Sequence, residues 1–171
     1  MNSLKQLIFK LTVFWVCLTL SCILNAQDSV KTNLKENAAR YFSVNDFQNA
    51  LPLYHQLLEI YPKEPVYQYR TALCLLNLNR NLDEAAGLFR SLLNDNDFPM
   101  AAFYYGRTLH LQYSFEDAIK AYSRFLATAK KSEIKRLNVQ RYIEMAKNGI
   151  ELTRSAKTVT VKNLTEVPVD Q

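Results

Sequence analysis

The sequence predicts an all-α protein built from three stacked helical hairpins and a final helix that closes the stack. One motif recurs three times at a spacing of about 34 residues, a common length for a helical hairpin with its turns. The chain of 171 residues contains only 3 glycines and 5 prolines, too few for the many tight turns of an all-β sandwich or barrel. Because 49% of the residues are hydrophobic, the chain has enough apolar side chains to form a packed core.

The recurring motif centres on three alanines that lie 35 and 33 residues apart, namely Ala50, Ala85 and Ala118. Four residues before each alanine stands a residue type that favours helix N-caps, as Asp46, Asn81 and Ser114 show. Four residues after each alanine stands an aromatic residue, in turn Tyr54, Phe89 and Tyr122. Four residues make about one helical turn, so the alanine and the aromatic share a face of one helix. Each motif therefore predicts the second helix of a hairpin.

A second set of small residues precedes these alanines by 12 or 13 residues, and it consists of Ala38, Ala72 and Gly106. Helices approach closely where the side chains at their contact are small, so this set predicts the first helix of each hairpin. In these features the region from about residue 32 to residue 129 resembles the tetratricopeptide-repeat family. The resemblance implies an α-solenoid with repeats at about 31–64, 65–98 and 99–131.

The expected helices of this solenoid span residues 33–44, 47–60, 66–78, 82–95, 99–112, 115–129 and 132–154. The last repeat of a stack cannot leave its apolar face bare, so the helix at 132–154 is expected to cap it. Residues 155–171 include the β-branched run Thr158–Val161 and are expected to form an extended tail.

Residues 1–26 have the three parts of a secretory signal peptide. Lys5 and Lys10 give a positive start, residues 11–24 carry no charge, and Ala26 is a small residue before the cleavage site. The sequence therefore predicts export, a mature helical domain at 27–154, and a location in the periplasm or at the periplasmic face of the outer membrane. Two alternatives stay open. One is an uncleaved anchor, although the apolar run is shorter than the roughly 20 residues that span a bilayer; the other is a lipoprotein modified at Cys22.

Positive charge is concentrated near the C-terminus. Residues 130–162 contain nine basic and three acidic residues, a local net charge of +6, whereas the rest of the chain after Ala26 has a net charge of −3. A solvated helix face is one explanation. Contact with an acidic partner, or peripheral association with a membrane of anionic lipids through this basic region, is the other. Export makes nucleic acid an unsuitable partner.

The sequence contains no arrangement of residues that predicts catalysis. His55 and His110 lie in different repeats, and neither has the neighbours of a metal-binding motif. Cys74 lies in an apolar run and is expected to be buried. The chain has no nucleophile motif and no glycine-rich phosphate loop. We therefore expect a non-catalytic protein with no cofactor and no metal.

A narrower resemblance rests on the segments Tyr41–Leu58 and Tyr104–Ile119, which are similar to the N-terminal repeats of envelope proteins of the OmpA family. Those proteins continue into a β-propeller and a peptidoglycan-binding domain, and some belong to the type IX secretion machinery. Residues 159–164 resemble the segment that leads into that propeller, yet this chain ends at Gln171. The resemblance implies an envelope or secretion-machinery protein as the partner. The alternative is a structural subunit, or a truncated copy, of such an outer-membrane component.

The repeat positions also predict a binding groove, because the first helices of such hairpins line the inner surface of the solenoid. The outward positions of these helices carry bulky or basic residues, and the predicted groove consists of Lys35, Phe42, Tyr69, Phe103, Arg107 and His110. A groove with aromatic and basic side chains suits an extended or helical segment of a partner. The sequence therefore predicts an interaction scaffold or adaptor. Alternatively, the capping helix or the tail folds back and fills the groove itself.

Overall fold

The computed structural model describes residues 30–165, and it describes side chains up to residue 156. This part of the chain contains helices and turns but no strand, so the predicted all-α class is confirmed. The predicted signal peptide at 1–26 lies outside the described residues. The described part begins with a helix at 30–43, and its other helices are α2 (Phe47–Ile60), α3 (Pro65–Leu78), α4 (Leu82–Ser91), α5 (Ala101–Leu111), α6 (Phe115–Thr128), α7 (Lys131–Leu137) and α8 (Val139–Thr165).

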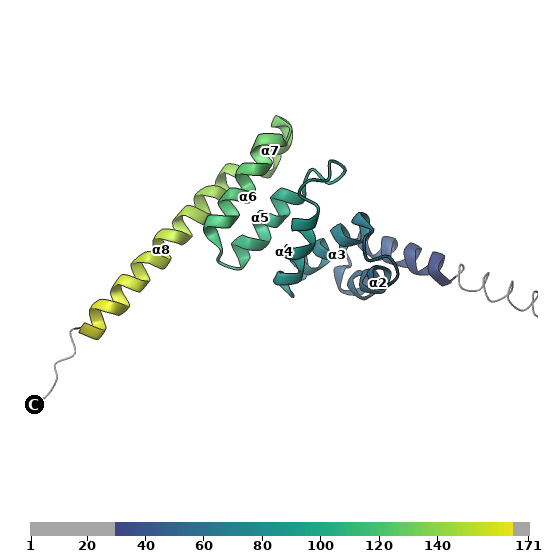
Figure 1. Cartoon of the computed structure of the whole chain (residues 1–171), viewed down its shortest axis with the longest axis horizontal. Helices are drawn as coiled ribbons and strands as arrows, with labels where there is room; N and C mark the ends of the chain where they lie inside the picture. Colours follow the sequence, from purple (N-terminus) through teal and green to yellow (C-terminus); the bar gives the residue numbers. More distant parts are fainter. Residues whose placement is uncertain (1–29, 166–171) are drawn as a thin grey trace, which may run out of the picture.

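The helices stack in chain order, as the row from α2 to α8 in Figure 1 shows. Helices α2 to α5 each pack against the next helix along the chain, and α8 packs against α6. Contacts also join α3 to α5 and α5 to α8, which are helices at equivalent places in successive hairpins. This arrangement is the predicted α-solenoid, and α8 occupies the place that the first helix of a further hairpin would take.

Pairs of small residues hold the two helices of each hairpin close together. The five alanines at these positions are all fully buried, and they are Ala38, Ala50, Ala72, Ala85 and Ala118. A Cβ atom on Gly106 would lie 2.7 Å from the Tyr122 ring, so the ring fills the space of the missing side chain. The aromatic residues of the motif are at most 1% exposed. The positions deduced from the repeat therefore form the core.

The predicted N-caps occupy their expected places, but only one makes the bond that defines a side-chain cap. The Asp46 carboxylate accepts a hydrogen bond from the Asn49 N–H at 3.2 Å. Asn81 and Ser114 precede α4 and α6 without such a bond. The Asn81 amide instead donates to the Glu84 carboxylate at 2.6 Å, which ties the first turn of α4.

The prediction of one continuous helix at 132–154 is wrong. The chain breaks at Asn138, whose φ of 49° is left-handed and whose N–H caps α7 by bonding to the Ile134 carbonyl. Asparagine adopts this conformation at low cost and often ends helices. A new helix, α8, then starts, and the residues that it turns toward the core differ from those that one continuous helix would turn there.

The predicted extended tail is also wrong for residues 155–165, because α8 continues to Thr165. The β-branched residues Thr158–Val161 lower helix propensity by only a few tenths of a kcal/mol each. The segment contains neither glycine nor proline to stop the helix before Pro168. None of the helices within residues 30–165 combines the length and the apolar content that crossing a membrane requires.

Helix α8 closes the third hairpin. Val139 and Ile143 join the buried cluster of α5 and α6, and Ala146 is fully buried. A Cβ atom on Gly149 would lie 2.5 Å from the Phe115 ring, so the glycine lets α8 approach the start of α6. The predicted cap is thus present, although its apolar stripe begins after the break at Asn138.

Cys74 is fully buried in the core of the first hairpin, as predicted. Burial raises the pKa of its thiol to about 12, so almost no reactive thiolate forms at neutral pH. This cysteine therefore contributes packing rather than chemistry.

Two glycines provide a matched test of the close helix contact. We expect Gly106→Ala to lower the free energy of unfolding by about 1–3 kcal/mol, because the added methyl group overpacks against the buried Tyr122 ring. Gly87 lies inside α4, and nothing lies within 4 Å of the place where its Cβ would stand. Gly87→Ala should therefore raise the free energy of unfolding by up to about 1 kcal/mol through helix propensity.

Chemical denaturation of both variants beside the parent measures the two effects. Stabilisation by Gly106→Ala equal to that by Gly87→Ala would contradict the close contact between α5 and α6.

Candidate functional site

A groove runs between the end of α5 and the middle of α8, and we call it the α5–α8 groove. It consists of two adjoining hollows with volumes of about 350 and 160 Å³, which share His110, Leu111 and Met145. The residues that line it are Arg107, His110, Leu111, Tyr113, Phe115, Tyr122, Tyr142, Met145, Asn148, Gly149 and Leu152. Two of the six residues predicted to bind a partner, Arg107 and His110, are therefore among its lining residues.

Large apolar side chains are exposed around this groove. The exposed fractions are 40% for Leu111, 80% for Tyr113, 46% for Met145 and 71% for Leu152. Of the seven large apolar residues exposed in the described chain, these four border one groove, whereas Val30, Val44 and Ile60 do not. Clustering of this kind marks an interaction surface, since single exposed apolar residues are common on any protein.

Tyr113 is held in an unfavourable backbone conformation. Its φ is 61°, in the left-handed region, where a residue other than glycine or asparagine costs about 1–2 kcal/mol. Asn45 has a φ of 58° at the equivalent turn of the first hairpin, one residue before the N-cap of the following helix. The third hairpin thus carries an exposed tyrosine where an asparagine would fit with less strain. Its ring packs edge-on against Phe115, at the mouth of the groove.

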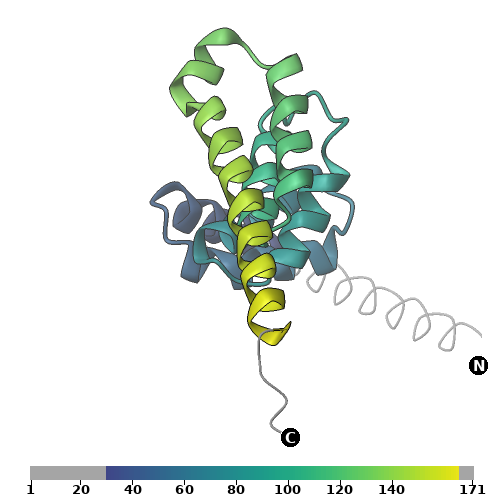
Figure 2. The same cartoon turned by 90° about the vertical axis from the view of Figure 1, so that its left-hand side faces the viewer.

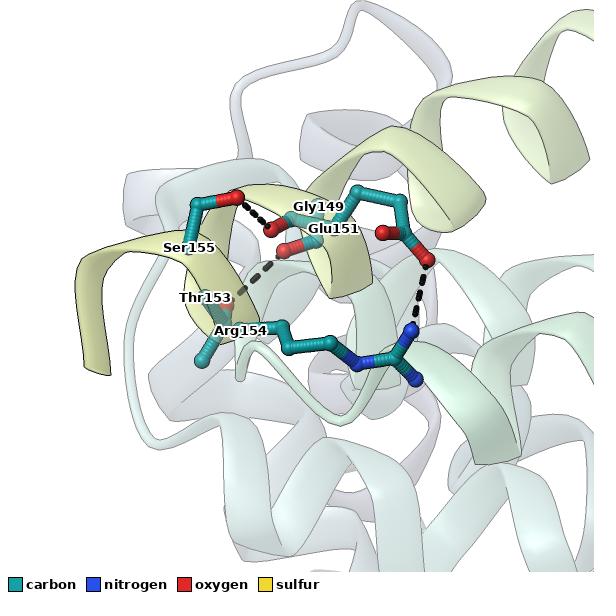
Figure 3. A network of polar contacts seen from close by, with 5 residues as sticks. All are labelled: Gly149, Glu151, Thr153, Arg154 and Ser155. Atoms are coloured by element: carbon teal, nitrogen blue, oxygen red, sulfur yellow. Dashed lines mark hydrogen bonds and ion pairs between the residues drawn. The ribbon is translucent and has the colours of Figure 1, made fainter. Parts of the chain in front are cut away.

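The polar residues of α8 beside the groove are satisfied within their own helix, as Figure 3 shows. The Thr153 hydroxyl donates to the Gly149 carbonyl and the Ser155 hydroxyl donates to the Glu151 carbonyl, both at 2.8 Å. Arg154 forms an ion pair with Glu151 at 3.2 Å. Leu152, between Glu151 and Thr153 on the same helix, is largely exposed.

Arg107 and His110 give the groove its polar character. The Arg107 guanidinium lies 5.6 Å from the centre of the Tyr142 ring, a cation–π contact between α5 and α8. The His110 ring packs edge-on against Phe115 at 5.4 Å, and its Nδ1 atom is buried without a hydrogen-bond partner. Burial lowers the pKa of His110, and the nearby Arg107 charge lowers it further. His110 is therefore neutral at physiological pH.

Two of the other predicted groove residues lie in the first hairpin. Lys35 is exposed, and its ammonium group lies 4.6 Å from the centre of the Tyr61 ring. The Tyr67 phenol raises the pKa of Lys35, desolvation opposes it, and the Tyr61 phenol adds to the increase. Phe42 is half-buried and packs edge-on against Tyr54, with the Arg70 guanidinium 5.5 Å from its ring. Neither residue borders the α5–α8 groove.

The remaining two predicted residues pack among other aromatic rings. Tyr69 is half-buried, with ring centres of Phe98 at 5.0 Å and Phe89 at 6.0 Å, and burial raises its pKa. Phe103 is only 1% exposed, and the Tyr142 ring of α8 lies 5.5 Å from it. Tyr142 of the capping helix thus covers Phe103, while the α5–α8 groove stays open beside Tyr142 and farther along the same helix.

Within residues 30–165 no group of three or more histidine, cysteine, aspartate and glutamate side chains is arranged to hold a metal ion. His55 lies 3.1 Å from the Glu84 carboxylate, in a contact that joins α2 to α4. His110 has aromatic and basic neighbours and no carboxylate in contact. The chemistry that these side chains offer is recognition through apolar, aromatic and basic contacts.

Sequence reasoning missed Leu111, Tyr113, Met145 and Leu152 as candidate site residues. Met145 and Leu152 lie seven residues apart, so they share one face of α8, away from the buried stripe of Ile143 and Ala146. This second apolar stripe was the signal in the sequence. It was hidden because the expectation of one continuous helix from residue 132 assigned Met145 and Leu152 to the wrong face of α8.

Comparison with known proteins agrees with this architecture. The family model described as tetratricopeptide repeat matches the chain at residues 36–98 and at residues 79–133. A comparison with curated proteins finds no match. Among solved structures, the chain is similar to the crystal structure of the Sgt2 TPR domain from Aspergillus fumigatus, with 19% sequence identity and a TM-score of 0.55. The match covers 82% of this chain and 87% of that chain, and at this identity the likeness concerns the fold alone.

The lowered pKa of His110 predicts a pH dependence of stability. The folded state resists protonation of His110, whereas the unfolded chain binds a proton near its usual pKa of about 6.5. This residue should therefore reduce stability as pH falls from above its unfolded pKa through its folded pKa. Denaturant unfolding at neutral and mildly acidic pH measures the effect. His110→Asn should lose less stability on acidification than the parent, and an unchanged loss would contradict the burial of this ring.

Proposed function

The chain belongs to the tetratricopeptide-repeat family, and we propose that it is an exported, non-catalytic adaptor of the bacterial cell envelope that binds a segment of another protein in the α5–α8 groove. Repeat proteins of this kind present extended surfaces for protein binding. The family thus supports the general role of an interaction scaffold. The particular surface is argued from the residues of the third hairpin and its cap.

The single observation that carries this proposal is the group of exposed apolar residues at Leu111, Tyr113, Met145 and Leu152. Tyr113 adds weight because its left-handed backbone works against stability, and strain of this kind is common at functional sites. A tyrosine with an exposed ring suits an interface, since it offers a large contact area with few rotatable bonds. The groove is open on one side, as a site for a helix or an extended segment must be.

The chemistry of the groove indicates what its partner carries. Leu111, Met145 and Leu152 require apolar side chains opposite them, and a helix supplies these at spacings of three, four and seven residues. Arg107 lies in the groove, and Arg141 is exposed on α8 with no acidic partner among the described residues. An amphipathic segment with acidic residues beside its apolar face therefore fits best.

The location in the envelope rests on the predicted signal peptide and on the resemblance to repeats of the OmpA family. Under this proposal the partner is an envelope or secretion-machinery protein, and the adaptor acts in the periplasm or at the periplasmic face of the outer membrane. The rival role is a permanent structural subunit of such an assembly. A permanent apolar interface keeps its affinity when salt is raised, whereas a smaller contact that depends on Arg107 weakens.

Tyr113→Asn is expected to stabilise the fold and to weaken partner binding. Asparagine adopts the left-handed conformation more readily, so the free energy of unfolding should rise by about 1 kcal/mol. Loss of the aromatic ring should reduce affinity about ten-fold or more, as removal of an interface anchor does. The measurements are denaturant unfolding and, in cells, the yield of crosslinks to the partner from a photoreactive residue placed at Leu152.

The matched control is Asn45→Tyr, which makes the reverse change at the equivalent turn of the first hairpin. It should lower the free energy of unfolding by about 1–2 kcal/mol and leave the crosslink yield unchanged. Full crosslinking by Tyr113→Asn would place the partner elsewhere on the solenoid. An equal loss of crosslinking by both variants would mean that the effect follows stability and not the groove.

A further inference from the structure

The short helix α7 presents an outward face made of basic residues. Ile134 and Leu137 point toward the core of the third hairpin, against which both pack. The opposite side carries Lys131, Lys135 and Arg136, all exposed, and the exposed Lys130 precedes the helix. Ser132 is the other exposed residue of α7, so this face contains no apolar side chain.

These basic groups lack acidic partners. The ion pairs found within residues 30–156 join His55 to Glu84, Lys120 to Asp117 and Arg154 to Glu151, and none of them involves α7. Glu133 is the single acidic residue of the helix and is half-buried. Residues 130–136 therefore carry a net charge of +3 in seven residues.

The structure separates α7 from the rest of the basic region that the sequence placed at 130–162. Residues 139–156 of α8 contain three basic and two acidic residues, a net charge of +1. One of these basic residues, Arg154, is paired with Glu151 on its own helix, as Figure 3 shows. Positive charge is therefore densest on α7, and the remaining positive charge of α8 comes from Lys157 and Lys162 near its C-terminal end.

Helix α7 lies at one end of the molecule, in both Figure 1 and Figure 2. The loop between α4 and α5, which carries Asp95 and Asp97, lies on the other side of α6 in Figure 2. The α5–α8 groove reaches the start of α6 at Phe115, and α7 follows the end of α6, so the 14 residues of α6 separate the two surfaces by about 20 Å.

We propose that the basic face of α7 docks the protein on a membrane surface rich in anionic phospholipid. Protein interfaces concentrate their energy in buried aromatic or apolar anchors, and this face has none. A lipid surface requires only unpaired cations within about 10 Å of its headgroups, which is the range of unscreened charge. Three basic residues on α7 and Lys130 directly before it meet that requirement. Docking by α7 holds the molecule at one end and leaves the α5–α8 groove free.

The test is binding of the purified mature protein to vesicles of phosphatidylcholine mixed with phosphatidylglycerol, beside vesicles of phosphatidylcholine alone. Each basic residue near an anionic surface strengthens binding about five-fold, so Lys131→Gln, Lys135→Gln and Arg136→Gln together should weaken it roughly a hundred-fold. The parent protein should bind the mixed vesicles but not those of phosphatidylcholine alone. Raising the salt concentration from about 0.05 to about 0.3 M should release it. These side chains are exposed, so the triple variant should have the same melting temperature as the parent protein.

The matched control removes the same charge from the body of the solenoid, by Lys63→Gln, Arg80→Gln and Arg90→Gln at three exposed positions. It should retain vesicle binding within a few-fold of the parent. Equal losses in the two triple variants would mean that net charge alone draws the protein to lipid, and the proposal would fail. It would also fail if the parent protein bound neither kind of vesicle. Binding of an acidic peptide such as polyglutamate without binding of vesicles would be one such result.

Discussion

Close contact between the two helices of each hairpin is the constraint on which the rest of the structure depends. The contact requires a small residue on each helix, and at Gly106 the space is so tight that a Cβ atom would meet the Tyr122 ring at 2.7 Å. The aromatic residue one turn away then fills the gap beside each contact, which is why Tyr54, Phe89 and Tyr122 are buried. Because each hairpin forms its own cluster and contacts mainly its neighbours, stability is distributed along the stack. One end of the stack can therefore expose apolar side chains while the other hairpins keep their cores.

The repeat could be deduced from the sequence because its physical causes are local. Small residues, N-caps and aromatics at fixed spacings determine which faces of the helices meet, and these spacings occur three times in the chain. The break at Asn138 has a local cause as well, since asparagines also hold left-handed positions at Asn45, Asn79 and Asn81. It was missed because the apolar residues on both sides of Asn138 fit the pattern of one continuous helix nearly as well as the pattern of two separate helices. The helical end of α8 was missed because propensity is a weak guide where a helix is already formed and only has to continue.

The candidate site was only partly predictable, because repeat position shows where a side chain points but not what covers it. Arg107 and His110 line the α5–α8 groove, whereas Phe103, one turn earlier on α5, is covered by Tyr142 of the capping helix. The difference depends on where α8 crosses α5, and that follows from the break at Asn138. Tyr69 is drawn into a cluster with Phe98, a residue of the loop between α4 and α5 whose position the repeat does not determine. Contacts between hairpins therefore decide which of the predicted residues stay accessible.

The last turns of α8 connect the groove to the stability of the fold. In Figures 1 and 2 the C-terminal part of α8 extends past the other helices, so its hydrogen bonds there receive no support from tertiary packing. Isolated helical segments of this length are marginally stable in water. A partner that lies against Met145 and Leu152 also lies along the start of this segment, and helical order in the segment would then rise with occupancy of the groove. Such coupling needs no movement within the three hairpins, because α8 contacts them mainly through α6 and α5. The capping helix is thus one wall of the groove, and it continues from there into the segment that packs least against the hairpins.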